Sequence, residues 1–549
     1  MLPALTPSLL SLVLSGGTPA EEGYLAAIPR PAGIVVLVPD APELLRRAQD
    51  SRWTQFLLEE VLGDKREKLL EELFDGSQMT GIMDALESLQ AFAGFAPLDL
   101  SDSQAAFGAV VKFDPERGAV EAWIESFLGH EISSESGVVH VQPLADGDHV
   151  ALSLEEDVLV LFAGANPEGL EEEVGQALSR LQENQGSPLD AGYLKTAHAQ
   201  TPAGSHIEVL ALPRELVVAS DPAVVEEPNV RTIVEEMHWA QASFRIGSGE
   251  SLESQFKLRV GKQGLLAEFL DLFVKPTSGE LFASMPKDVQ GVSAGLLDLT
   301  GLAELVLKAL ALEPSGESSQ QAEMFIEGME TQLGFHLIDD LIAVFTGEFA
   351  MFSQGLDLPD NQEALLGIDI QEDLLTRDTF LLGLHAGDDL IDYLDTVITQ
   401  FGVEPMLEFG EAGEFETYSL VIESEDVSMH IGISDGLAVL ASHQDDLSLV
   451  AKTIAGDGPS IRSHPKLGPR VDTFPGPFSL NETSSAIEVL LGTTKVILTQ
   501  ELVTSGEEAW LLEGITELLD GGAKGFFKGT SAYWWGLSEG VVTWGVEAR

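Results

Sequence analysis

The sequence contains no cysteine among its 549 residues. This absence excludes disulfide bonds, cysteine nucleophiles, thiolate metal sites and an N-terminal cysteine that could carry a lipid. It does not by itself identify a cellular compartment.

Basic residues are scarce. Lys and Arg number 29 against 90 Asp and Glu, which gives a net charge of −61. A surface this acidic repels nucleic acid phosphates and anionic lipid headgroups, so we expect neither as a partner. The carboxylates are spread along the whole chain, which favours a role in solvation over a defined cation site.

Long apolar runs are also missing, so we expect no transmembrane segment. The first 20 residues have an apolar core at 9–14 and small residues up to Ala20, and they resemble a secretory signal peptide. The usual basic region is absent, because no Lys or Arg precedes Arg30. A start codon placed too far downstream would explain this. We therefore predict a secreted or periplasmic protein whose mature chain is soluble.

What the chain does contain is enough apolar material for real cores. Hydrophobic residues make up 44% of it, so global disorder is not expected. A length of 549 residues exceeds that of one ordinary domain.

Residues 318–353 show the local pattern most clearly. They predict a helix, a glycine stop, a short helix and a strand. Met324, Phe325, Met329 and Leu333 recur at helical spacing and are expected on the buried face of the helix. Phe349 is expected to be buried on the strand.

A weaker copy of this pattern occurs near residues 86–112, where residues 83–92 are predicted to be helical. The copy pairs Gly94 with Gly334. Further along, residues 205–210 (SHIEVL) pair with residues 485–490 (SAIEVL). Two long repeats indicate an internal duplication and not a short-period solenoid.

These repeats divide the chain into a signal peptide at 1–20, a first lobe at 21–265 and a second lobe at 266–549. Acidic turn residues beside alternating apolar positions favour antiparallel hairpins. The predicted fold class is therefore α+β, with two homologous lobes, each an antiparallel sheet covered on one face by helices.

Three segments of the second half carry a family resemblance: Met285-Pro286-Lys287-Asp288, the sequence GFHLIDDL that begins at Gly334, and Thr346-Gly347-Glu348-Phe349-Ala350. With these motifs the chain resembles bacterial envelope proteins catalogued as domain of unknown function 3352. The resemblance covers most of the second half and, faintly, the first, where Gly108-Ala109 stands in place of Gly-Glu. It implies a fold and an envelope location, and it brings no assigned activity or catalytic residues.

The motifs of common catalytic sites are missing. The eleven histidines are scattered, with no His-Glu-x-x-His spacing, and there is no Gly-x-Ser-x-Gly elbow. We expect no cofactor. One cluster of oxygen donors could bind calcium, and the alternative is an ordinary solvated loop: Asp357, Asp360, Asn361 and Glu363.

A run of aromatic residues near the C-terminus is the other candidate site. Tyr533, Trp534, Trp535 and Trp544 could form a ligand platform, whereas strand alternation would place one of the tryptophans in a core.

We therefore expect a non-catalytic secreted or periplasmic protein that binds or scaffolds an unidentified protein. Two alternatives stay open: a carrier of a small apolar ligand in a cavity between sheet and helices, and a hydrolase with an unrecognised carboxylate site. A cavity lined by Leu, Phe and Met would favour the carrier, and a full core the scaffold. Paired carboxylates buried in a cleft would favour the enzyme.

Overall fold

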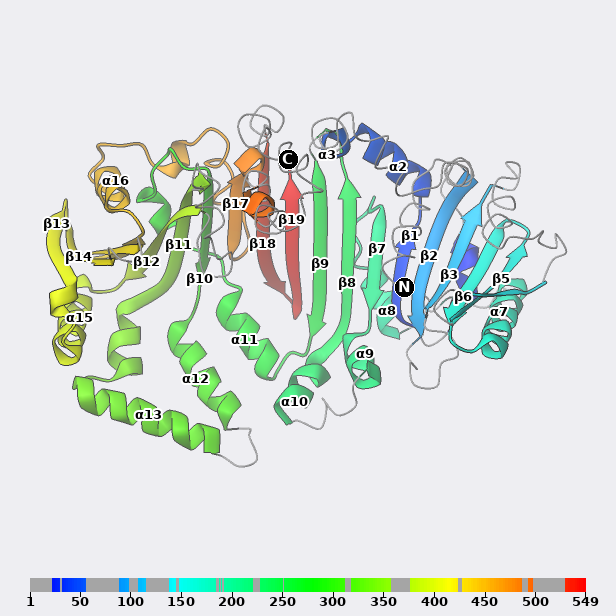
Figure 1. Cartoon of the computed structure of the whole chain (residues 1–549), viewed down its shortest axis with the longest axis horizontal. Coiled ribbons are helices and arrows are strands. Elements are labelled where there is room, and N and C mark those ends of the chain that lie inside the picture. The colour runs from blue at the N-terminus through cyan, green and yellow to red at the C-terminus, as the bar shows by residue number, and fades with distance from the viewer. Residues whose placement is uncertain are drawn as a thin grey trace. The chain divides into compact units, whose positions relative to one another are not determined.

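The chain divides into two compact units, Met1–Gly261 (unit 1) and Lys262–Arg549 (unit 2). Each is built on an antiparallel sheet with helices packed against it (Figure 1), which confirms the α+β class. The computed structural model describes residues 22–29, 32–55, 88–97, 107–114, 138–144, 148–183, 187, 189, 192–220, 228–249, 251–311, 317–356, 376–422, 427–485, 492–496 and 529–549.

The sheet of unit 1 has its first strand at the centre. Its strands are β1 (Ala32–Val38), β2 (Leu89–Pro97), β3 (Phe107–Phe113), β4 (His140–Pro143), β5 (His149–Glu155), β6 (Val158–Gly164), β7 (Ile207–Ala211), β8 (Met237–Ile246) and β9 (Leu252–Val260). They are ordered β4-β5-β6-β3-β2-β1-β7-β8-β9, and every neighbouring pair is antiparallel.

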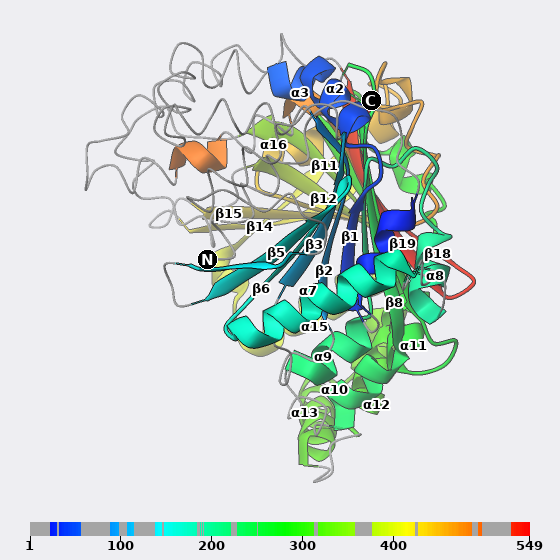
Figure 2. The same cartoon turned by 90° about the vertical axis from the view of Figure 1, so that its right-hand side faces the viewer.

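Helices lie against both faces of this sheet. They are η1 (Glu22–Ala27), α2 (Ala41–Asp50), α3 (Arg52–Gln55), α7 (Pro167–Gln182), α8 (Gly192–His198), α9 (Pro213–Ser220) and α10 (Pro228–Glu236). On one face, Leu44 of α2 packs with Val38 and Phe92. On the opposite face, the rings of Phe95 and Phe162 meet edge to face at 5.4 Å, and α7 runs beside β5 and β6 (Figure 2).

Unit 2 repeats the strand order of unit 1. Its strands are β10 (Gly291–Leu296), β11 (Phe345–Leu356), β12 (Thr376–Leu384), β13 (Leu407–Ala412), β14 (Phe415–Ile422), β15 (Val427–Ser434), β16 (Leu437–Ala441), β17 (Phe478–Glu482), β18 (Thr530–Ser538) and β19 (Val541–Ala548). The order is β13-β14-β15-β16-β12-β11-β10-β17-β18-β19, again antiparallel throughout. The described part of unit 2 therefore matches unit 1 strand for strand, with β13 added at the edge.

Among the described residues of unit 2, a hydrophobic core lies on each face of the sheet. Its helical segments are α11 (Leu265–Phe273), η7 (Glu280–Ala283), α12 (Leu299–Leu310), α13 (Glu317–Leu333), η8 (Leu337–Leu341), η9 (Ile342–Val344), α15 (Gly387–Phe401), η10 (Glu404–Met406), α16 (Gln444–Ile454) and η11 (Ile461–Ser463). Phe282 of η7 and Leu447 of α16 belong to the core that contains Phe352. On the other face, Ile398 of α15 packs with Leu384 and Ile433.

The strand register gives a residue-level match between the units. In unit 1, Val35 lies opposite both Phe95 and Leu210. In unit 2, Val292 lies opposite both Phe352 and Leu480. The central strands β1 and β10 thus occupy the same position in their sheets. This match determines which side chain of unit 1 corresponds to which side chain of unit 2.

The expected pairing of Gly94 with Gly334 is wrong. Gly94 lies inside β2, whereas Gly334, with φ +83°, ends α13. The register instead aligns residues 92–95 (Phe-Ala-Gly-Phe) with residues 349–352 (Phe-Ala-Met-Phe). The expected helix over residues 83–92 is wrong over its described end, because β2 starts at Leu89. A short apolar run that is buried on both faces looks the same for a strand and for a buried helix.

Other expectations about individual residues also change. The match of residues 205–210 with residues 485–490 is wrong, because β17 pairs with β10 where β7 pairs with β1. Met324 and Phe325 are 63% and 67% exposed, while Leu333 is buried as expected. Phe349 is half-buried, because the buried face of β11 carries its neighbours on the alternate positions.

Candidate functional site

The sequence-based candidate for a metal site lies outside the described residues. Asp357, Asp360, Asn361 and Glu363 all fall in residues 357–375, and the proposed signal peptide at 1–20 falls outside them as well. Within the part of the chain that is described, no group of three or more His, Asp or Glu side chains could hold a metal ion. No helix among the described residues is both long enough and apolar enough to cross a membrane.

The aromatic run is split between the two faces of the sheet. Trp534 packs against the core of unit 2. On the opposite face, Trp535 and Trp544 stack on each other across β18 and β19, with ring centroids 5.7 Å apart. Tyr533 is 43% exposed and, two residues before Trp535 on the same strand, lies on the face of Trp535.

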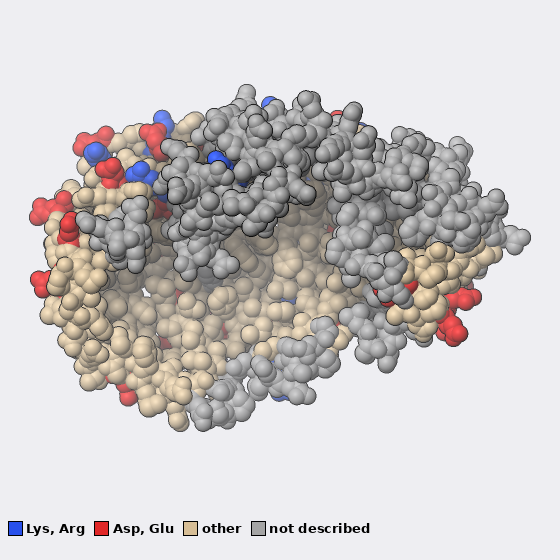
Figure 3. All heavy atoms as spheres, in the orientation of Figure 1, with Lys and Arg blue, Asp and Glu red and all other residues tan. Residues whose placement is uncertain are grey.

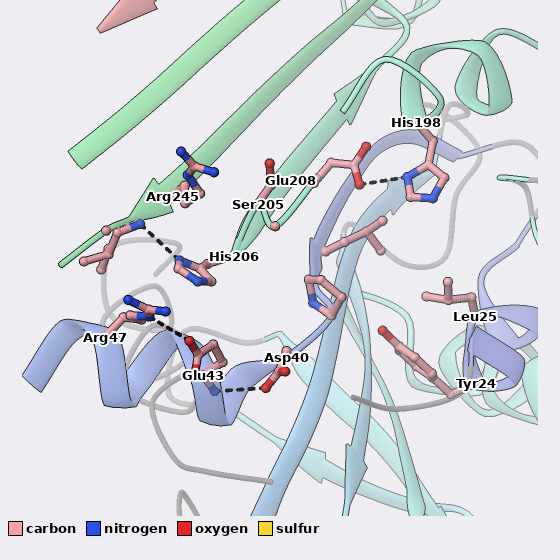
Figure 4. A pocket seen from close by; sticks show the side chains of 15 residues that line it. Tyr24, Leu25, Asp40, Glu43, Arg47, His198, Ser205, His206, Glu208 and Arg245 are labelled. Atoms are coloured by element: carbon pink, nitrogen blue, oxygen red, sulfur yellow. Dashed lines mark hydrogen bonds and ion pairs between the residues drawn. The ribbon is translucent and has the colours of Figure 1, made fainter. Parts of the chain in front are cut away.

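A pocket of about 660 Å³ lies within unit 1 and was not predicted from the sequence. Its wall is formed by η1, by the junction between β1 and α2, by the end of α8, by the start of β7 and by the end of β8 (Figure 4). Segments far apart in the sequence meet here because β1 pairs with β7, and β7 with β8.

The helix α2 and its N-cap place three charged side chains in this wall. Asp40 caps the helix by accepting the backbone N–H of Glu43 at 2.9 Å. Glu43 in turn accepts the Nε–H of Arg47 at 2.7 Å, one helical turn further on. Hydrogen bonds from Arg46 and then Arg47 lower the pKa of Glu43 below its ordinary value. Glu43 is therefore ionised at neutral pH and holds Arg47 in place at the pocket.

His206 is buried at the start of β7. Its Nδ1 accepts the backbone N–H of Ile246 at 3.0 Å, so the ring carries its proton on Nε2. Burial lowers the pKa of His206 below its ordinary value, and the Glu43 carboxylate acts in the opposite direction. The ring is therefore neutral at pH 7 and offers an N–H donor.

Glu208 is a buried carboxylate, 4% exposed, on the strand that lines the pocket. His198 of α8 contacts its Oε2 through Nδ1 at 2.8 Å, and the hydroxyl of Thr201 donates to its Oε1. Both carboxylate oxygens therefore have partners within the protein. A carboxylate at this depth needs such partners, because an uncompensated buried charge is costly.

Unit 2 fills the same position with aromatic rings. Glu208 lies opposite Leu37 on β1, and Phe478 lies opposite Ala294 on β10, at the matching register position. Phe478 packs on Phe282 and stacks on Phe474, with centroids 6.0 and 4.5 Å away. Phe474 stands four residues before Phe478, where unit 1 has Gly204 before Glu208. The shared framework therefore does not impose a cavity, and the residues of unit 1 create it.

The sequence holds one signal for this pocket, in the stretch Ser205 to Leu210 that the repeat match compares with residues 485–490. In the structure most of this stretch forms β7. Glu208 stands on the buried face of that strand between apolar neighbours, with His206 two positions before it. A charged residue at an inward strand position indicates a buried partner or a site, but the partners His198 and Thr201 lie outside the strand and cannot be found from spacing.

Comparison with known proteins adds little. No family model matches the sequence, and no curated protein matches it. A solved chain described as "Structure of crystal form I of TP0453" is similar at a TM-score of 0.23 and 10% sequence identity, over 46% of this chain and 86% of that one. A similarity this weak carries over neither a fold nor a function.

Proposed function

We propose that the protein is a non-catalytic binding protein that works outside the cytoplasm, and that unit 1 holds a small ligand in its pocket. The observation that carries this proposal is the contrast between Glu208 with its adjoining cavity in unit 1 and Phe478 in a filled core in unit 2. Filling such a position with apolar groups stabilises a fold. Unit 1 keeps this position open and lines it with charged groups, so it lacks the stability that apolar filling would add. Binding sites commonly carry such a loss of stability.

The location outside the cytoplasm rests on the sequence alone. It is supported by the apolar segment at residues 9–14 and by the resemblance to envelope proteins. The division of the chain into two homologous lobes is part of the same proposal, and the common strand order supports it.

The pocket favours a ligand with both apolar and polar parts over the purely apolar cargo of the carrier alternative. Tyr24, Leu25 and Leu37 supply apolar wall, while Arg47 and His206 supply hydrogen-bond donors. A purely apolar ligand would bury these donors without partners, which costs free energy.

A hydrolytic role has less support. The contact of His198 with Glu208 has the form of a base held by a carboxylate. Ser205 supplies a serine hydroxyl to the pocket wall, and this hydroxyl donates to the Pro202 carbonyl at 2.7 Å. This hydroxyl is therefore engaged by the backbone and not by the imidazole.

Filling the pocket tests the proposal. Ser205 lines the pocket of unit 1, and Pro475 stands at the matching position of unit 2, three residues before Phe478 as Ser205 is before Glu208. We expect the Ser205→Phe variant of the full chain to lose most of the fluorescence gained by the neutral dye Nile red, an apolar ring system that carries a carbonyl acceptor, and the Pro475→Phe control to keep it. Both variants should melt as cooperatively as the unmodified protein. Equal dye binding by Ser205→Phe and by the unmodified protein would refute a binding pocket in unit 1.

A further inference from the structure

Hydrogen-bond donors and acceptors are used unequally in the pocket of unit 1. The described contacts engage one N–H of Arg47, with Glu43 at 2.7 Å, and one of Arg245, with Glu253 at 2.6 Å. A guanidinium has five N–H donors, so each arginine has donors beyond these contacts. His206 adds its Nε2–H, because its Nδ1 is the acceptor for Ile246.

The carboxylates of the pocket, in contrast, are already engaged. Glu43 accepts Arg47 and Arg46 on one oxygen, at 2.7 and 2.6 Å, and Arg46 again on the other at 2.8 Å. Glu208 accepts His198 and Thr201 on its two oxygens. Asp40 caps the start of α2. The polar part of the wall therefore offers donors, and it calls for a ligand that brings acceptors.

Donors and apolar wall lie on different sides of the pocket. Figure 4 shows Arg245, His206 and Arg47 one above the other on one side, with Tyr24 and Leu25 across from them. Tyr24 and Leu25 are 5% and 4% exposed, so they form a fixed apolar surface. A ligand that fits both sides has an acceptor-rich head and an apolar body.

The negative charge of the whole chain limits how much negative charge the acceptor-rich head of the ligand can carry. With a net charge of −61, the protein repels anions, and a dianion is repelled about twice as strongly as a monoanion. The pocket wall itself carries three carboxylates and two arginines, so it supplies directed N–H donors and no net positive charge. A head with a single negative charge is therefore repelled less than a dianion, and a carboxylate accepts a guanidinium in bidentate geometry.

We propose that the pocket of unit 1 takes a small organic carboxylate, with the acid group at Arg47, His206 and Arg245 and the apolar body against Tyr24 and Leu25. This assignment rests on the proposed function, since it names the ligand class of the same site.

Three probes of equal chain length test it: octanoate, 1-octanol and octylamine, each titrated into the full chain by calorimetry. We expect octanoate to bind roughly tenfold more tightly than 1-octanol, because charge-assisted hydrogen bonds add to the apolar contact. Octylamine should bind more weakly than either. Arg47→Gln should weaken octanoate roughly tenfold and leave 1-octanol unchanged. Arg46→Gln is the matched control, because Arg46 is the neighbouring partner of Glu43 and does not line the pocket.

The outcomes separate the ligand class from the site. If 1-octanol binds as tightly as octanoate, or if Arg47→Gln has no more effect than Arg46→Gln, the carboxylate assignment is wrong while the pocket stands. If none of the probes binds and Ser205→Phe also leaves Nile red binding unchanged, both the ligand class and the proposed function fail.

Discussion

Gly347 of the Thr-Gly-Glu motif has a backbone conformation and a close backbone neighbour that disfavour any residue with a Cβ. Its φ is +80°, and a Cβ placed there would lie 2.2 Å from the carbonyl oxygen of Leu297. The same Leu297 donates its N–H to the Gly347 carbonyl at 2.9 Å, so the two backbones are held together. The next residue, Glu348, accepts Ser278 at 2.6 Å and the Gly279 N–H at 2.9 Å. The motif that carries the family resemblance therefore has a structural role in this chain.

We predict that Gly347→Ala destabilises unit 2 by roughly 2–4 kcal/mol, since it combines an unfavourable φ with a clash against fixed backbone. The matched control is Gly328→Ala in α13, where nothing lies within 4 Å of the added Cβ. This control should be neutral or slightly stabilising, because alanine favours a helix. Urea unfolding of both variants measures the difference, and equal stabilities would show that the loop at Leu297 can move.

At the scale of the element, Asp446 fixes the start of α16 on the sheet. It is 1% exposed and accepts the Nε–H and Nη2–H of Arg377 from β12 at 3.1 and 2.6 Å. Gln354 of β11 donates to it at 2.5 Å. By their place in the sequence, Asp445 and Asp446 are alike favourable charges in the first turn of the helix. Their surroundings differ in the structure: Asp445 is exposed, whereas Asp446 is buried and accepts hydrogen bonds from β11 and β12.

Asp446→Asn should therefore lower the free energy of unfolding by about 2–4 kcal/mol, since it leaves Arg377 without its bidentate partner in a poorly solvated position. Asp445→Asn should change it by less than about 0.5 kcal/mol. Thermal melts of the two variants give the comparison. A similar loss in both would mean that the helix dipole, and not the contact with Arg377, sets the effect.

Element type was predictable where the periodicity ran long enough. The apolar periodicity of residues 169–181 and 390–401 predicts helices, and these residues form parts of α7 and α15. Residues 83–92 are predicted to be helical, but the chain forms β2 from Leu89 onward, because burial on both faces removes the periodic signal. It was harder to predict which strand of unit 1 corresponds to which strand of unit 2. This correspondence depends on the pairing register of the strands and not on short stretches of similar sequence.

At the scale of the whole molecule, charge is the dominant property. On the face shown in Figure 3, the described Asp and Glu side chains appear in separate small groups and not as one block. Such a distribution repels itself without forming a site, and the repulsion weakens the folded state at low ionic strength.

We predict that the melting temperature rises smoothly with sodium chloride, because the Debye length falls to about 10 Å at 0.1 M. For domains of this size, a gain of about 1 kcal/mol corresponds to roughly 2–4 °C. The melts should be repeated at fixed ionic strength with calcium and with a chelator. A saturable shift at micromolar calcium would contradict the solvation interpretation and would make Asp357 to Glu363 the first residues to mutate.

The sequence by itself determined the composition-driven properties and the class of fold. A net charge of −61 and alternating apolar segments are local or additive features, and they predict acidity, antiparallel strands and helices without reference to tertiary contacts. The tertiary structure decided which segments correspond and where a ligand could bind. His198, His206 and Arg245 line one pocket because β7 pairs with both β1 and β8, and this register is set by long-range packing that no local pattern contains.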